Sequence, residues 1–275
     1  MQMLNVLENF DLRSKGWPSA DAAHLVIEAM RDADRFTVDD DRFTTAAILG
    51  DSMLSLDGPE HRRHRSPFAP AFRPGVLREQ FDDVLAADVA SLLAGLDPSG
   101  AELRSGLAGP LAVNAITRFL GLADVDAADV LDWYQSISKA ITDLTTGAGL
   151  DQGDLGAVTE INRRVQQTLD ASTDTGSDSD PDSASLLARI GASGALGPDE
   201  LGSAAAVVMF GAIETSEAMI ANALWHLLTT EGAWTALDRD RGLVANAIEE
   251  SLRLEPAAAV VDRYTTHATE LGGVT

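Results

Sequence analysis

The 275-residue sequence contains no cysteine. This absence excludes disulfide bonds, cysteine-rich zinc sites and thiol nucleophiles from the chain. Basic residues are also scarce, with 20 lysines and arginines against 43 acids, which leaves a formal net charge of −23. A charge of this sign and size argues against nucleic acid or an anionic membrane as a partner. Because the acids are spread along the chain, we interpret them as a solvated surface.

Long hydrophobic runs are absent as well. The longest charge-free apolar stretch, from Leu201 to Ile213, has 13 residues, whereas a bilayer-spanning helix needs ~20. Polar and charged residues interrupt the first 16 positions, which therefore do not resemble an export signal. We expect a cytoplasmic protein. With 45% hydrophobic residues, the chain has enough apolar material for one folded domain over residues 1–275.

Helical periodicity dominates what is present. Apolar residues recur at intervals of three and four in segments that we expect to be core-packed helices, namely 76–96, 110–121, 126–145 and 155–171. A longer helix is predicted over 198 to about 230, since Pro198, Asp199 and Glu200 form a typical helix start. Its middle is apolar nearly all round, as in a helix buried through a large domain. A last helix, 242–254, should stop before Pro256.

Two segments depart from the helical pattern. The composition of residues 172–185, STDTGSDSDPDSAS, predicts a surface loop. The final segment, VVDRYTTHATELGGVT, alternates Val, Tyr and Thr with polar residues before a Gly-Gly turn, which predicts a strand entering a hairpin. The expected fold class is therefore mainly α with a small β element near the C-terminus.

Three short clusters carry residue types that chemistry requires. The first, DGPEHRRHRSPFAPAF, covers residues 57–72, and five of its nine residues from His61 to Ala69 are His or Arg. On a helix, His61 and Arg65 lie four residues apart on one face, where they can hold a carboxylate or phosphate of a ligand. The alternative is a local basic patch that pairs with neighbouring Asp and Glu.

The second cluster is FGAIET, Phe210 to Thr215, in the middle of the long predicted helix. An unpaired carboxylate is costly to bury, so an acid beside a hydroxyl here indicates a use. Gly211 and Ala212 remove side-chain bulk, which lets a flat ligand approach the backbone. The Thr215 hydroxyl can donate back to the Gly211 carbonyl and loosen the helix. Alternatively, this is a kinked helix whose Glu214 reaches the surface or an ion pair.

The third cluster is EESLRLEP, residues 249–256. Glu250 and Arg253 are three residues apart and would face the same way on a helix. By itself this is an ordinary surface ion pair, because such pairs contribute little and E-x-x-R is common.

The order and spacing of these clusters resemble the bacterial cytochrome P-450 family of haem-thiolate monooxygenases. A basic helix is followed far downstream by the FGAIET helix, then by E-x-x-R about 35 residues later, then by a strand with Arg263 that ends ELGGVT. The phrases VNAITRFLGL and LGPDELGSAAAVVMFGAIETSEAMIANALWHLL belong to the same resemblance, which runs from about Phe36 to Thr275. It implies an incomplete cytochrome P-450-like helical fold with a long central buried helix.

The resemblance also implies how haem would be held. His61 and Arg65 match a pair that binds a haem propionate, and Arg263 matches another propionate ligand. Gly211 and Ala212 match the small residues that make room for iron-bound oxygen. The local chemistry agrees, because propionates need cationic donors.

Catalytic and structural roles follow from the same resemblance. Glu214 and Thr215 match the acid–alcohol pair that delivers protons to iron-bound dioxygen. Glu250 and Arg253 match a buried structural pair that supports the haem-binding core. The family further implies a small organic substrate and a ferredoxin-type redox partner.

The sequence departs from the family pattern at both ends. Family members continue past the GGVT hairpin through a glycine-rich loop whose cysteine ligates the haem iron, and their first sheet and helix normally precede a segment like Ala29–Thr45. Without a cysteine, this chain supplies no axial metal ligand. These departures predict a form that is truncated at both ends and catalytically incompetent as given.

Two interpretations besides the truncated monooxygenase stay open. The chain could resemble the haem-free relatives of the family that act as helpers and activate a partner enzyme such as a glycosyltransferase. Alternatively, it is a product without any activity. The presence of the predicted propionate and oxygen residues favours the monooxygenase interpretation over the helper. A haem-free helper has no physical need for those side chains.

Overall fold

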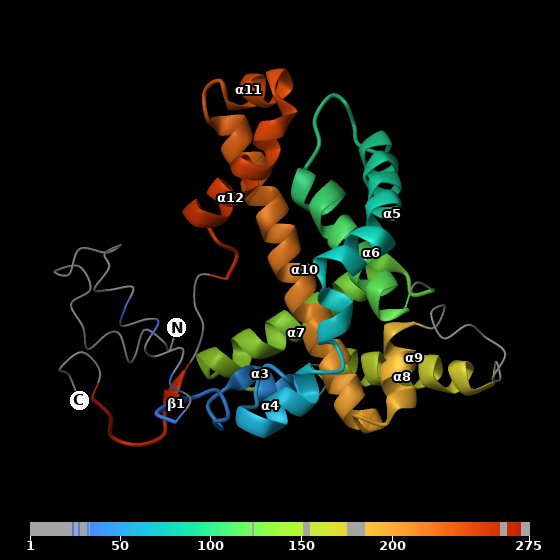
Figure 1. Ribbon diagram of the computed structural model, residues 1–275, viewed down its shortest axis with the longest axis vertical. Coiled ribbons are helices and arrows are strands. Elements are labelled where there is room, and N and C mark those ends of the chain that lie inside the picture. The colour runs from blue at the N-terminus through green and yellow to red at the C-terminus, as the bar shows by residue number, and fades with distance from the viewer. Residues whose placement is uncertain are drawn as a thin grey trace.

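The computed structural model describes residues 24, 27, 32, 34–122, 124–150, 155–174, 185–258 and 263–270. Most of this part of the chain is helical (Figure 1), which confirms the mainly α expectation. They are α3 (Thr44–Leu49), α4 (Gly58–Arg65), α5 (Pro74–Ala94), α6 (Gly109–Leu120), α7 (Ala127–Thr146), α8 (Gly156–Asp174), α9 (Leu186–Ser193), α10 (Pro198–Thr229), α11 (Ala233–Arg239) and α12 (Val244–Leu254). Short 3-10 segments, η1 (Ala69–Phe72) and η4 (Arg241–Leu243), and a π-helical turn, η2 (Arg104–Ala108), connect them.

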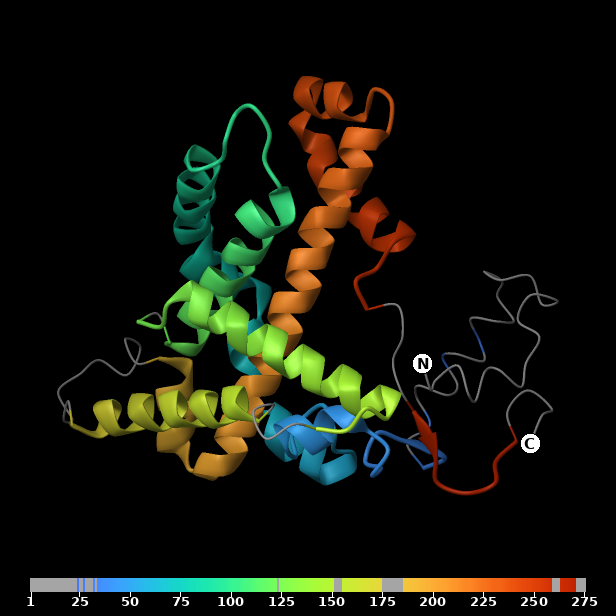
Figure 2. The same ribbon diagram turned by 180° about the vertical axis from the view of Figure 1, so that it is seen from behind.

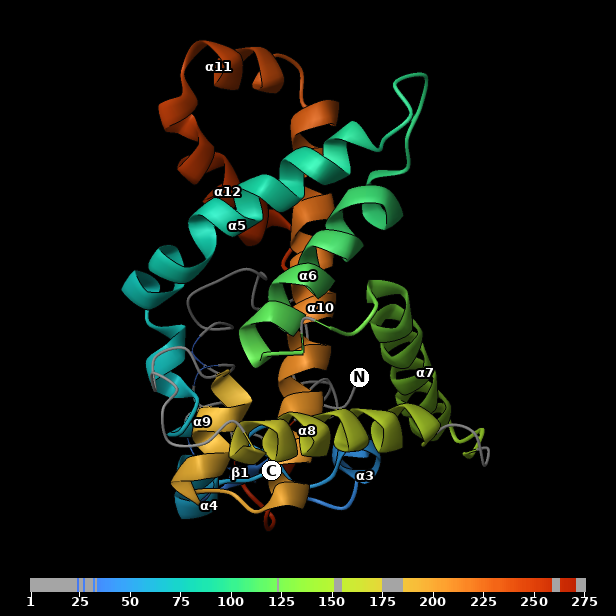
Figure 3. The same ribbon diagram turned by 90° about the vertical axis from the view of Figure 1, so that its right-hand side faces the viewer.

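Helix α10 is the axis around which the other helices are arranged (Figures 1 and 3). It packs against α6, α8 and η2 along its length and against α12 near its C-terminal end. Its start follows from local chemistry. Pro198 occupies the first turn, and the Glu200 carboxylate accepts a hydrogen bond from the Gly197 N–H at 2.8 Å, which satisfies one of the free donors of the helix N-terminus.

Burial along α10 changes in the middle of the helix. Its N-terminal half, from Leu201 to Ile213, is largely buried, whereas Glu214, Thr215 and Ser216 are exposed. Beyond Ile213 the buried residue of α10 is Glu217, so the burial expected for this helix is concentrated in its N-terminal half. By length and composition alone α10 could cross a bilayer, but its apolar N-terminal half is in contact with α6 and α8 in the protein core.

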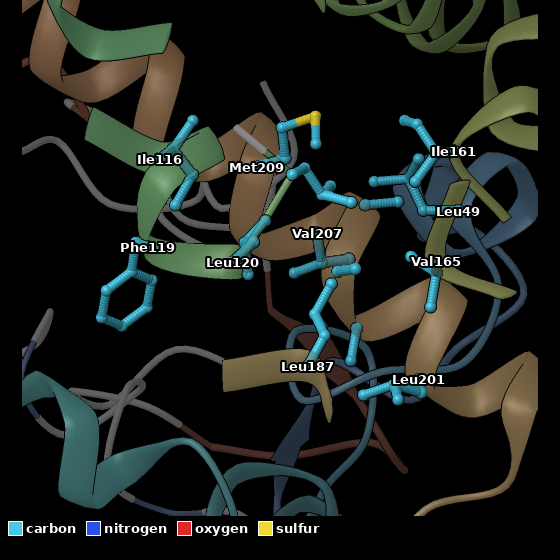
Figure 4. Close-up of a cluster of buried hydrophobic side chains, with 14 of the residues drawn as sticks. Leu49, Ile116, Phe119, Leu120, Ile161, Val165, Leu187, Leu201, Val207 and Met209 are labelled. Carbon is cyan, nitrogen blue, oxygen red and sulfur yellow. The ribbon is translucent and has the colours of Figure 1, made fainter. Parts of the chain in front are cut away.

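The core lies where the N-terminal half of α10 meets α6, α7, α8 and α9 (Figures 2 and 4). Figure 4 shows Leu120, Leu187 and Leu201 in the buried cluster to which α6, α9 and α10 contribute. All three side chains are fully buried. Burial of each contributes about 1.5–3 kcal/mol relative to exposure, so this cluster is a main source of stability for the packed helices.

Helix α5 differs from its prediction. The apolar stripe predicted over 76–96 is present, but its residues are only half-buried, and no residue of α5 is fully buried. The physical reason is that Leu77, Phe81 and Leu85 line an open cavity, and Leu77 and Phe81 pack only against the edge of the core.

The small β element joins the two ends of the described chain. Strand β1 (Phe36–Thr37) pairs antiparallel with β2 (Tyr264–Thr265), with Phe36 opposite Thr265. The Tyr264 hydroxyl donates to the Arg42 carbonyl at 3.1 Å, and the Arg42 guanidinium lies 4.6 Å from the centre of the Tyr264 ring. The strand predicted after α12 is thus confirmed, but its partner is a segment far earlier in the sequence. The Gly-Gly turn of the predicted hairpin lies outside the described residues.

The loop predicted over residues 172–185 begins later than expected. Helix α8 continues to Asp174, three residues into this segment, and 175–184 lie outside the described residues.

Three short helices, α3, α9 and α11, have no counterpart among the sequence predictions. Each has at most eight residues and so shows little more than two periods of a helical pattern.

Candidate functional site

The first predicted pair lies on α4. His61 is half-buried and Arg65 is exposed, four residues apart on this helix as expected. The start of α4 is tied to the segment after β1, because the Asp57 carboxylate accepts from the Thr37 hydroxyl at 2.5 Å and from the Val38 N–H at 3.0 Å. His61 and Arg65 thus lie on a helix whose start is tied to the β element.

The strongest contacts of α4 belong to a basic residue that was not predicted. Arg63 donates to both oxygens of Glu200 on α10, at 2.5 and 3.0 Å, and to Glu60 at 2.9 Å. The Arg63 guanidinium lowers the pKa of Glu200 to about 2. The alternative of a basic patch that pairs with acids is therefore confirmed for Arg63, which fastens α4 to the start of α10.

His64 lies under this ion pair and is 1% exposed. Its Nε2 is 3.0 Å from the Arg63 guanidinium, while its Nδ1 has no hydrogen-bond partner among the described residues. His64 Nε2 also lies 3.5 Å from Glu200 Oε1, so the imidazole packs against both members of the ion pair.

The second predicted cluster forms an open turn of α10. The Thr215 hydroxyl donates to the Gly211 carbonyl at 2.6 Å, so the expected hydrogen bond is present. A methyl group placed on Gly211 would meet no atom within 4 Å. Glu214 and Thr215 are exposed. This turn therefore offers a hydroxyl, a carboxylate and bare backbone beside open space, which a flat ligand requires.

Ala212 faces a different space, an apolar cavity of about 360 Å³ between α5, α6 and α10. Phe81 and Phe119 line it together with Ala212 and Ser216. Their rings are in contact, with centroids 6.0 Å apart. Gly211 and Ala212, which were predicted to make room for the same ligand, thus face different spaces: Ala212 lines this cavity, whereas Gly211 is not among its lining residues.

The third predicted pair is in contact but is not buried. Arg253 donates to both oxygens of Glu250, at 2.6 and 2.7 Å, and this contact lowers the pKa of Glu250. The side chains are 65% and 55% exposed, so the predicted buried pair is a surface pair in this structure. Helix α12 is instead held to α10 by buried Ser251, whose hydroxyl is 3.0 Å from His226 Nδ1.

The structure does not gather the predicted residues into one cluster. Arg263 is half-buried and directly precedes β2. Glu200, which anchors α4, lies 14 residues before Glu214 on α10, or about 21 Å along the helix axis. The described residues contain no hydrogen bond or ion pair that joins the α4 pair to the Glu214 turn.

One polar cluster beside Glu214 was missed by the sequence interpretation. Glu217 is 8% exposed, and its carboxylate accepts from Arg104 Nε of η2 at 2.6 Å. Tyr134 of α7 is half-buried with its ring 5.6 Å from that of Phe210. Burial raises the pKa of Tyr134 and the Ser138 hydroxyl lowers it, while the charges of Glu214 and Glu217 raise it and Arg104 opposes them. The three-residue spacing of Glu214 and Glu217 indicates that both lie on one face of a helix. Arg104 lies 113 residues from Glu217 in the sequence, so no local pattern indicates that the two are in contact.

No protein-family model matches the chain, but individual known proteins do. The chain is 29% identical over 237 residues to nocardicin C N-oxygenase of Nocardia uniformis subsp. tsuyamanensis, which covers 85% of this chain and 57% of that protein. It is 28% identical over 232 residues to the cytochrome P-450 monooxygenase PikC of Streptomyces venezuelae, covering 82% of this chain and 53% of PikC.

A solved structure shows the same fold. The cytochrome P-450 enzyme CxnD, which forms a C–S bond in chuangxinmycin biosynthesis, matches with a TM-score of 0.77 at 23% identity, over 91% of this chain and 62% of CxnD. The 275 residues thus span little more than half the length of the relatives that they match.

Proposed function

This chain has the incomplete helical fold of a bacterial cytochrome P-450, and on that premise we propose that it belongs to a haem-dependent monooxygenase that oxidises a small organic molecule. The observation that carries the proposal is the open turn of α10. There Thr215 bonds to Gly211, Glu214 is exposed, and nothing lies beside the Gly211 Cα. An acid and an alcohol beside bare backbone suit proton delivery to a flat cofactor.

The residues present fit the periphery of a haem but not its iron. His61 and Arg65 are cationic donors for a propionate, and Arg263 is a third. The face of α10 at Gly211 has room for a planar group. The 275 residues contain no cysteine, and the described part of the chain has no cluster of metal-ligating side chains. We therefore assign this chain a role in holding and serving the haem, without the axial ligand.

The roles of the chain's own residues follow from their positions. When bound, haem supplies the activation of dioxygen. The Thr215 hydroxyl is both a donor and an acceptor, so its bond to Gly211 leaves it able to accept a proton from Glu214 or water. Glu214 is exposed and can exchange that proton with solvent. Gly211 keeps side-chain atoms away from the reacting face.

The proposal includes a cytoplasmic location, a small organic substrate and a ferredoxin-type redox partner. The names of two relatives, nocardicin C N-oxygenase and a cytochrome P-450 monooxygenase, support the oxidation of a small organic molecule. The apolar cavity between α5, α6 and α10 shows that this fold leaves apolar surface next to the central helix.

A haem titration tests the proposed function. Ferric haem is added to the purified 275-residue chain, and binding is followed by the Soret absorbance and by quenching of tryptophan fluorescence. We expect binding of one haem per chain. Replacement of both predicted propionate residues, by H61Q/R65Q, should weaken binding at least tenfold, because two charge-assisted hydrogen bonds contribute about 1.5–3 kcal/mol each before solvent screening.

The matched control is R62Q, which removes one exposed arginine from the same helix. It should leave haem affinity unchanged within about twofold. The proposal is overturned if the parent chain binds no haem, or if H61Q/R65Q and R62Q have equal effects.

A further inference from the structure

The turn of α10 that carries Glu214 and Thr215 has one firm polar anchor. Glu217 lies at the end of this turn, and its carboxylate is bound by Arg104 Nε at 2.6 Å. The neighbouring residues Glu214, Thr215 and Ser216 are exposed, whereas Glu217 is 8% exposed. Among the described residues this is the one ion pair of α10 between Leu201 and Trp225.

The partner of Glu217 comes from an unusual piece of backbone. Arg104 begins η2, a π-helical turn that runs directly into α6. The Glu217 carboxylate also approaches Gly109, where an added methyl group would lie 3.7 Å from its carbon. Isolated π-turns inside helical segments are frequent near functional sites. Arg104 therefore joins the α6 side of the core to α10 at the Glu214 turn.

A carboxylate this deeply buried needs a counter-charge. Without Arg104, Glu217 would place a second negative charge three residues from Glu214, on the same side of the helix. Repulsion between two carboxylates at this spacing would destabilise this turn of α10. Arg104 supplies the compensating positive charge beside Glu217 and leaves Glu214 as the exposed carboxylate of the turn.

We propose that Arg104 is a positioning residue for Glu214, because it neutralises the buried Glu217 and fixes the turn of α10 that presents Glu214 and Thr215. The role in proton transfer rests on the proposed function. The charge arrangement itself does not, and it can be measured on the chain without haem.

Tyr134 provides a built-in reporter for this cluster. The chain has two tyrosines, so Y264F leaves Tyr134 as the single phenol that titrates in the ultraviolet spectrum. Burial is the main cause that raises the pKa of Tyr134, and the neighbouring Ser138 hydroxyl lowers it. The charges of Glu214 and Glu217 raise this pKa as smaller effects, and Arg104 acts against those charges. Each charge that is removed should therefore move this titration in a known direction.

The experiment is an alkaline titration of tyrosinate absorbance in the Y264F background, with R104Q and E217Q added separately. The proposal predicts opposite signs. R104Q raises the pKa of Tyr134 because a cation is lost, and E217Q lowers it because a negative charge is lost. If the Arg104–Glu217 pair acted only by packing, both variants would loosen the site, expose Tyr134 to water and lower its pKa. Shifts of the same sign would therefore overturn the proposal.

Two further variants sharpen the test. R104K keeps the positive charge and should restore most of the parent titration. R118Q removes an exposed arginine of α6 that pairs with Asp88, and it should leave Tyr134 unchanged. An equal shift in R118Q and R104Q contradicts a local effect of Arg104. Since no variant here is scored by haem binding, failure of the haem titration and failure of this titration are separate results.

Discussion

The ion pair between α4 and α10 gives the most quantitative prediction, through E200Q. Glu200 is bound by both terminal nitrogens of Arg63, and its pKa falls from 4.5 to about 2. A difference of that size would correspond to about 3 kcal/mol in a fully desolvated pair. The Glu200 side chain is 36% exposed, so solvent screening reduces the expected contribution to about 1–1.5 kcal/mol.

A matched control separates the ion pair from the helix dipole. Asp199 lies in the same first turn, is exposed, and shares the favourable interaction with the N-terminal dipole, about 0.3–1 kcal/mol. D199N should therefore cost only that dipole interaction, whereas E200Q should cost about 1.5–2 kcal/mol in urea unfolding at pH 7. Equal costs for the two variants would refute the assignment of stability to the Arg63–Glu200 contact.

The pH dependence of the same pair has a definite sign. Because the pKa of Glu200 is lower in the folded chain, its stabilisation is complete above the unfolded value of 4.5 and is lost as pH falls towards about 2. The difference in unfolding free energy between parent and E200Q should thus shrink between pH 4.5 and pH 2. A difference that stays constant over this range contradicts the argument.

Three further tests, each by urea unfolding, address other parts of the structure. L187A removes a fully buried core side chain and should cost about 2–5 kcal/mol, whereas L228A, at a side chain that is 62% exposed, should cost under about 0.5 kcal/mol; similar costs would contradict the assigned core. G121A should be more destabilising than G147A, since both glycines have positive φ but only a methyl group on Gly121 would collide with a neighbouring side chain, at 2.0 Å. E250Q should leave the unfolding midpoint unchanged because its ion pair is exposed, and a large loss would restore the buried-pair interpretation.

The helical part of the fold was predictable because its signals are local. Helices α6, α7 and α12 begin and end within two residues of their predicted limits, since proline starts, glycine ends and apolar spacing are all visible in the sequence. The partner of β2 was not predictable in the same way. Pairing of Tyr264 with Thr37 depends on how the intervening helices fold, and no local pattern encodes it.

The candidate site was predictable only in its local contacts. The Thr215 bond to Gly211 and the Glu250–Arg253 pair follow from helical spacing and are both present. Burial was predicted less well, because it depends on which helices cover a face. Arg104 shows the same limit, since its role arises from contact with Glu217 across 113 residues.

The most direct test of the account is where haem binds on the chain. Ferric protoporphyrin is paramagnetic and broadens the nuclear magnetic resonance signals of nearby amides, whereas gallium protoporphyrin is a diamagnetic control of the same shape. The account predicts selective broadening at Arg65, Gly211 and Thr215, with sharp signals at Ile161 of the buried core. Broadening centred on Phe81 in the α5–α6 cavity, or no selective broadening, would contradict the claim that α4 and the open turn of α10 form the haem-facing surface.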